Sequence, residues 1–134
     1  RIYTFTLDCT TDSEGNLSFT VTDPQTLSGI TGKFSEAGGA LTFDDKVLAF
    51  PLLADGQLAP ICTPWILLNT LRSGYISACG QEEENLRVYY DDSFENTVLH
   101  LEVLLNEDDI PLYGEIFWRE RRILSADIRN FVLL

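Results

Sequence analysis

The sequence predicts a mostly β fold of the α+β class, in which about ten strands form one long, curved antiparallel sheet with a single short helix on its concave side. Three observations predict it. Apolar and polar residues alternate over most of the chain, short acidic or glycine-containing turns separate the alternating segments, and no strand–helix–strand repeat is present. A length of 134 residues fits one domain covering 1–134.

The N-terminal half is expected to begin with a β-hairpin whose turn lies at 12–16. Asp23-Pro24 ends the second strand, because proline cannot donate to a sheet ladder. Gly38-Gly39 is expected to reverse the chain, and Asp44-Asp45 to form a sharp turn. The strands expected here cover 3–9, 17–22, 30–34, 41–43 and 47–50.

Residues 61–74 predict the helix, about three turns long. Thr63 can cap its start, Pro64 suits the first helical position, and Gly74 suits the position just past its end. Apolar residues at spacings of three and four predict one buried stripe. The stripe consists of Ile61, Trp65, Leu68 and Leu71.

After Gly74 the strand pattern returns, and the clearest strand covers 98–105. Alternate residues from Leu99 to Leu105 face one way there, while His100 and Glu102 face the other. The five strands expected in this half cover 75–79, 86–91, 98–105, 112–119 and 123–132.

Charge and hydropathy exclude several classes of function. Nine Lys plus Arg against 21 Asp plus Glu give a formal net charge of −12, which repels nucleic acid. No apolar run reaches the ~18 residues of a membrane-spanning helix. A lipid-bearing cysteine would have to lie upstream of residue 1, because the residues before Cys9 are not the small ones such a site needs. Membrane contact is therefore expected only through such an anchor.

Three cysteines, Cys9, Cys62 and Cys79, show no clustered spacing, so no zinc site, other metal site or disulfide framework is predicted. We expect them to be small buried hydrophobic residues. In an oxidising compartment one pair could form a bridge, and Cys62 with Cys79, on either side of the helix, would be the choice.

No catalytic or cofactor motif is present, and we expect neither an enzyme nor a bound cofactor. His100, the single histidine, is expected to be an ordinary strand residue. Less favoured alternatives remain for acidic residues and for one basic turn. They are a calcium site at Asp91, Asp92 and Glu95, an acid–base pair at Asp44 and Asp45 or at Asp91 and Glu115, and an anion-docking turn at 119–122. Asn16-Leu-Ser18 has the form of a glycosylation sequon, but a hairpin turn explains Asn16.

Aromatic side chains are spread over nearly every predicted element, and most are expected to pack in the core. One short helix covers only part of a long sheet, however. The uncovered apolar surface is expected to be filled by a ligand, a partner or a missing element.

Several segments together resemble the lipoprotein-carrier superfamily of LolA-like and LolB-like factors and their counterparts among Gram-positive, often spore-forming, lipoproteins. The segments are Leu27-Ser-Gly-Ile30, Leu41-Thr-Phe43, the proline-then-helix insertion, Ile110-Pro111, Gly114-Glu-Ile116, Arg122-Ile-Leu-Ser125 and Ile128-Arg-Asn-Phe131. The resemblance covers the chain from about Tyr3 to Phe131 and implies an unclosed β-barrel with an apolar cavity for acyl chains. This sequence departs from the carriers in beginning almost directly with a strand and in having one helix.

The leading hypothesis is a non-catalytic, extracytoplasmic lipoprotein of the cell envelope that holds an apolar, acyl or lipid ligand. The alternative is a protein-interaction module that docks a partner, such as a cell-wall enzyme, or a second copy of itself. The candidate lining residues are Phe5, Phe19, Phe34, Trp65, Leu68 and Leu101.

Overall fold

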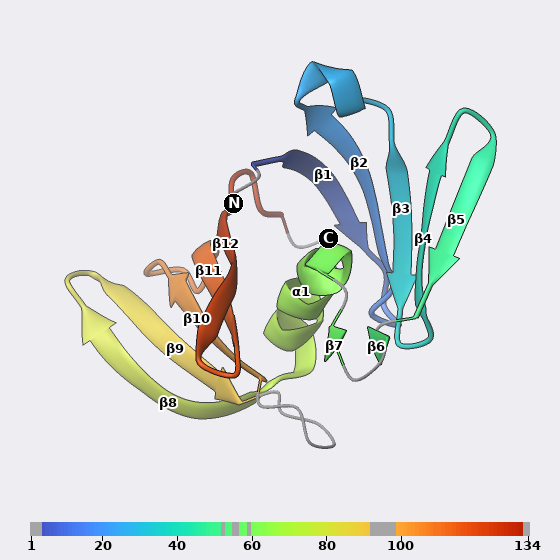
Figure 1. Cartoon of the computed structure of the whole chain (residues 1–134). Coiled ribbons are helices and arrows are strands. Elements are labelled where there is room, and N and C mark those ends of the chain that lie inside the picture. Colours follow the sequence, from blue (N-terminus) through green and yellow to red (C-terminus); the bar gives the residue numbers. More distant parts are fainter. Residues whose placement is uncertain (1–3, 52, 55–56, 59, 92–98, 133–134) are drawn as a thin grey trace. The chain divides into compact units, whose positions relative to one another are not determined.

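The computed structural model describes residues 4–51, 53–54, 57–58, 60–91 and 99–132, and these confirm a mostly β, antiparallel fold with one α-helix. The chain divides into two compact units, an N-terminal unit of residues 1–68 and a C-terminal unit of residues 69–134. Each contains one five-stranded sheet (Figure 1). The expectation of one domain over 1–134 stays a prediction.

The sheet of the N-terminal unit is a meander in which each strand pairs with the next along the chain. Its strands are β1 (Thr6–Thr11), β2 (Leu17–Asp23), β3 (Thr31–Ser35), β4 (Gly38–Phe43) and β5 (Lys46–Phe50). A 3₁₀ turn over Gln25–Leu27 links β2 to β3, and a two-stranded ribbon of β6 (Leu53–Ala54) and β7 (Gln57–Leu58) follows β5. The sequence analysis did not predict this ribbon.

Strict alternation on β2 builds the core of this unit. Leu17, Phe19 and Val21 are buried, whereas the residues between them are exposed. The predicted hairpin is confirmed, with Cys9 opposite Phe19, although β1 starts at Thr6 rather than at residue 3. Hydrogen bonds that Asn16 donates to the Asp12 carboxylate close its turn and lower the pKa of Asp12.

The turns that bracket β4 differ in one respect from the prediction. Asp44 and Asp45 both have positive φ, of 48° and 64°, and form the expected tight turn between β4 and β5. Gly38-Gly39 is not a turn, because the chain reverses one step earlier and both glycines lie in β4. Gly38 is needed there because its φ is 128° and a Cβ would collide with the carbonyl oxygen of Phe50.

The helix α1 (Thr63–Ser73) confirms the predicted segment, with a 3₁₀ turn over Pro60–Cys62 before it. Gly74 follows the last helical residue, and its N–H donates to Thr70 O at 2.7 Å. The predicted buried stripe is wrong in part, since Ile61 is exposed and Leu68 and Leu71 are only half-buried. The buried side chains here are Cys62, Thr63, Trp65, Ile66, Leu67 and Thr70. The buried side of the helix therefore differs from the side that the spacing of apolar residues predicts.

The C-terminal unit contains a second antiparallel meander. Its strands are β8 (Tyr75–Glu82), β9 (Asn85–Asp91), β10 (Leu99–Leu105), β11 (Pro111–Trp118) and β12 (Arg121–Asp127). On β10 the predicted faces are confirmed, with Leu99, Leu101 and Val103 fully buried and His100 on the other side. The last strand ends at Asp127 and not at Val132.

The ten strands expected from the sequence therefore belong to two separate hydrogen-bonded sheets in the described residues. Alternation identifies a strand and its faces, but it does not identify which strands share hydrogen bonds.

Candidate functional site

Two of the predicted lining residues, Phe19 and Phe34, come together in the N-terminal unit. Their rings lie on neighbouring strands, β2 and β3, with centroids 5.3 Å apart. The ring of Phe50, on β5, lies 5.9 Å from that of Phe34 and extends the row. Offset aromatic pairs at such distances stabilise a sheet beyond the area they bury. We call Phe19, Phe34 and Phe50 the aromatic row.

Two glycines lie beneath this row and explain its placement. A Cβ at Gly32 would collide with the ring of Phe19, and a Cβ at Gly39 would collide with the ring of Phe34. Each glycine is the cross-strand partner of the phenylalanine that covers it. The missing side chains let both rings lie against the backbone, which buries Phe19 and Phe34 to 3% and 2% exposure.

The apolar surface continues from the row onto the last two strands, where it becomes exposed. Leu41 is half-buried, but Phe43 and Leu48 are 48% and 65% exposed. Alternation and register place them on the same side of the sheet as Phe50, because Leu41 pairs with Leu48 and Phe43 with Lys46. We call Leu41, Phe43, Leu48 and Phe50 the apolar face of β4–β5.

The opposite side of the same strands carries smaller residues. A shallow, open depression there is lined by Lys33, Ala40, Ala49 and neighbouring backbone. Val47 lies on this side and is 67% exposed. β5 thus exposes large apolar side chains on both sides of the sheet.

The other four predicted lining residues do not join the aromatic row. Phe5 precedes β1 and is 49% exposed, and Leu68 is half-buried near the middle of α1. Leu101 is fully buried in β10 of the C-terminal unit. Trp65 is buried, and its indole Nε1–H donates to Gly15 O at 2.8 Å, which ties the start of α1 to the turn between β1 and β2.

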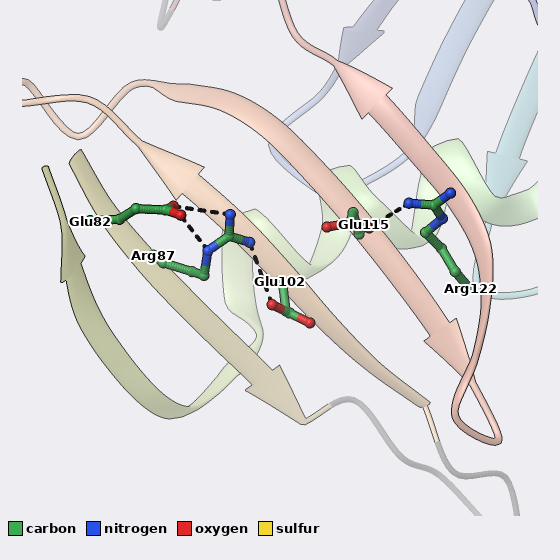
Figure 2. Close-up of polar contacts among 5 residues, drawn as sticks. All are labelled: Glu82, Arg87, Glu102, Glu115 and Arg122. Atoms are coloured by element: carbon green, nitrogen blue, oxygen red, sulfur yellow. Dashed lines mark hydrogen bonds and ion pairs between the residues drawn. The ribbon is translucent and has the colours of Figure 1, made fainter.

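The C-terminal unit carries a polar face with several ion pairs (Figure 2). Arg87 contacts Glu82 at 3.0 Å and Glu102 at 3.4 Å. Partial burial opposes the charge of this guanidinium, but Glu82 and then Glu102 raise the pKa of Arg87 above its ordinary value. His100 stacks on the cross-strand Phe117, with ring centroids 5.2 Å apart, as expected of an ordinary strand residue.

The predicted acid–base alternatives gain no geometric support in the described residues. Glu115 forms an ion pair with Arg122 at 3.1 Å, and Asp91 lies two strands away, opposite His100. Asp44 and Asp45 lie in the β4–β5 turn. No group of three or more potential metal ligands occurs in the part of the chain that the structure describes. Asp92 and Glu95 of the calcium alternative lie outside it.

The turn between β11 and β12 consists of Arg119 and Glu120, which both have positive φ, and Arg121 and Arg122 of the predicted basic segment already belong to β12. The guanidinium of Arg119 lies 5.3 Å from the ring centre of Trp118. The expected turn is confirmed, and anion docking at this turn stays a prediction.

The expectation for the cysteines is wrong for two of the three. Cys9 and Cys79 are exposed, because they lie on the edge strands β1 and β8, and only Cys62 is buried. All three are free thiols, and the bridge between Cys62 and Cys79 in an oxidising compartment stays a prediction. Burial raises the pKa of Cys62 to about 11, which makes it an inert thiol at neutral pH.

The strand at 47–50 was expected, but its exposure on both sides of the sheet was not, and neither was the anchoring role of Trp65. A signal for the first was present, because Val47 to Phe50 is a continuous apolar run and continuous runs leave both sides of an edge strand apolar. No local signal pairs Trp65 with Gly15, which is 50 residues away.

Comparison with protein-family models, with curated proteins and with solved structures found no match in any of the three. Among the described residues, none of the helices has the length and apolarity needed to cross a membrane.

Proposed function

We propose that this chain is a non-catalytic binding protein that holds an apolar ligand, of the acyl or lipid class, against the apolar face of β4–β5. The observation that carries the proposal is the exposure of Phe43 and Leu48 beside the aromatic row, in which Phe19 and Phe34 are buried and Phe50 is half-buried. Large apolar side chains grouped on one exposed surface mark binding sites more often than isolated ones do. The absence of a catalytic motif in the sequence agrees with a role in binding.

The chemistry suits an acyl chain. Each methylene that leaves water gains about 0.8 kcal/mol, so a ligand of this class needs apolar walls and few polar partners. Leu41, Leu48 and the ring of Phe50 supply such walls. The proposal includes a location outside the cytoplasm, in the cell envelope. It also includes the resemblance to LolA-like and LolB-like carriers, which implies an unclosed, bent sheet with α1 on its concave side.

Organic extraction of the purified protein followed by mass spectrometry tests the proposal directly. We expect an acyl species in stoichiometric amount, or, for stripped protein, saturable binding of a fluorescent fatty acid. Leu48→Gln should weaken this binding about tenfold or more, because it puts an amide against the acyl chain.

Val47→Gln is the matched control, since Val47 neighbours Leu48, is equally exposed, and lies on the other side of the sheet. We expect its affinity for the fatty acid to be unchanged. Equal losses in the two variants, or no saturable binding by the parent protein, would contradict an acyl site on this face.

A second candidate function, a protein-interaction module, is favoured by one different observation. β5 is the last strand of its sheet and exposes Val47 as well as Leu48, so apolar surface is open on both sides of a free edge. A ligand lying on one face leaves the other face unchanged, whereas a strand added at the edge places its own side chains beside Leu48 on one face and beside Val47 on the other.

A further inference from the structure

We infer that β5 is a self-complementary edge and that two copies of this chain associate through antiparallel β5–β5 pairing centred on Leu48. The inference deepens the protein-interaction candidate above and does not depend on the acyl ligand. It rests on the chemistry of the edge, on its hydrogen-bonding groups and on its register with a second copy.

The β5 edge has fewer of the features that keep natural sheet edges apart than the other edge strands have, since its own protection is limited to Lys46 and the following Pro51. Edge strands are usually protected by charges, proline, bulges or irregular register. β1 is mainly polar and β12 carries Arg121, Arg122 and Asp127, while the pairing of β8 is interrupted by a bulge at Ile76/Ala78. β5 pairs in regular register with β4 over its whole length and has one charged residue, Lys46.

Within the described part of the N-terminal sheet, the main chain of β5 has a defined set of groups that β4 does not pair. A two-residue turn at Asp44-Asp45 makes Phe43 and Lys46 the hydrogen-bonded pair that closes the hairpin. Because hydrogen-bonded and non-hydrogen-bonded pairs alternate, the main-chain groups of Leu48 and Phe50 also point towards β4. The carbonyl oxygen of Phe50 lies close to Gly38 of β4, which agrees with that orientation. The N–H and C=O groups of Val47 and Ala49 therefore point to the free edge.

A second copy satisfies these groups without conflict. When two β5 strands run antiparallel about Leu48, Val47 of each copy lies opposite Ala49 of the other, and these pairs exchange four hydrogen bonds. Leu48 then meets Leu48 across the two-fold axis. Lys46 lies opposite Phe50 and Asp45 opposite Pro51, so no like charges face each other in this register.

The expected dimer is weak and depends on salt. One pair of five-residue strands buries less than the roughly 1,000 Å² of a stable interface, so we expect a dissociation constant on the order of 10–100 µM. Each copy carries a formal charge of −12, which opposes association. Raising NaCl from about 50 to 500 mM should therefore tighten the dimer several-fold.

Analytical ultracentrifugation of the full chain tests the inference through paired charge variants. Val47→Lys with Ala49→Lys places two cations opposite each other in each hydrogen-bonded pair, and we expect a monomer at all concentrations. Val47→Lys with Ala49→Glu places a cation opposite a carboxylate in the same pairs, and we expect the dimer to return. Both variants leave Leu48 and the apolar face of β4–β5 intact, so loss of acyl binding cannot account for the difference.

A cross-linking experiment fixes the register independently. With the exposed Cys9 and Cys79 changed to serine, Leu48→Cys should form a covalent dimer on oxidation, because two non-hydrogen-bonded partners lie about 4.5 Å apart at Cα. Val47→Cys is the control. Its two copies would lie about 8 Å apart, beyond the roughly 7 Å that a disulfide spans.

Three results of the association and cross-linking experiments would overturn the inference. They are a parent chain that stays monomeric at millimolar concentration, identical association of the two charge variants, and cross-linking through Val47→Cys as efficient as through Leu48→Cys. Protection of the Val47 and Ala49 amides from hydrogen exchange only after a fatty acid is added would likewise assign the edge to the ligand and not to a second copy.

Discussion

The two tryptophans use their indole groups differently, and this difference predicts unequal effects of the same substitution on stability. Trp65 Nε1–H donates to the carbonyl of the buried Gly15. Trp65→Phe leaves that oxygen without its donor, so we expect a loss of about 1–3 kcal/mol in the free energy of unfolding. Urea unfolding followed by circular dichroism measures it.

Trp118→Phe is the control for this prediction. Trp118 Nε1 is buried and has no hydrogen-bond partner among the described residues, so its removal should leave stability within about 0.5 kcal/mol. If Trp118→Phe were as costly as Trp65→Phe, ring packing and not the hydrogen bond would explain the role of Trp65.

Cys62 makes stability depend on pH at the alkaline end. Burial raises the pKa of Cys62 to about 11 from an ordinary value near 9, so the folded chain holds its proton more tightly than the unfolded chain. The contribution of the Cys62 thiol to the free energy of unfolding is fully present below about pH 9 and is lost as the pH rises towards 11. The pKa of Cys9 is raised to about 11 as well, by desolvation and by the neighbouring Asp8, and burial raises the pKa of Tyr90 in the same direction. Urea unfolding at pH 8 and pH 10.5 should differ by about 2 kcal/mol through Cys62.

Substitution separates this effect from general alkaline unfolding. Cys62→Ala should make the decline between pH 9 and 11 shallower, although the smaller side chain lowers stability at pH 8. Cys79→Ala should leave the decline unchanged, because Cys79 is exposed. A decline that is identical in all three proteins would contradict the assignment to Cys62.

At the scale of elements, the β4–β5 turn limits the stability of the hairpin that carries β5. Asp44 and Asp45 both adopt positive φ, which aspartate tolerates better than most residues but which costs it more than it costs glycine. Asp45→Gly should therefore stabilise the chain by about 1 kcal/mol, and Asp45→Ala should destabilise it. Thermal unfolding of the two variants measures the difference. If glycine were the less stable of the two, the Asp45 side chain would have to contribute more than its backbone costs.

Strands and turns were predictable here because their signals are local. Alternation from Leu17 to Val21 and from Leu99 to Val103 identified the buried faces, and Asp44-Asp45 identified a turn. The buried stripe of α1 was not predictable, since burial of Thr63 and Thr70 depends on what the helix packs against. Phe19 and Phe34, two of the predicted lining residues, lie side by side. Their contact was not predictable, because it depends on glycines of neighbouring strands that only strand pairing reveals.

At the scale of the whole molecule, charge opposes compactness. The formal charge of −12 includes acidic turns such as Glu82–Glu84, and repulsion among them is relieved when the chain expands. Added salt also weakens the Arg87 and Arg122 ion pairs, but exposed pairs of this kind contribute about 0–1 kcal/mol each. We therefore expect the melting temperature to rise by several degrees between about 20 and 500 mM NaCl.

A variant with fewer charges distinguishes repulsion from a general effect of salt. Glu83→Gln with Glu84→Gln removes two carboxylates from the β8–β9 turn and spares Glu82, which pairs with Arg87. At low salt this variant should melt at a higher temperature than the parent, and its response to NaCl should be smaller. If both proteins gained the same number of degrees, salt would be acting on apolar burial instead of on charge. A fall in melting temperature with salt would mean that the ion pairs of the C-terminal sheet outweigh the repulsion.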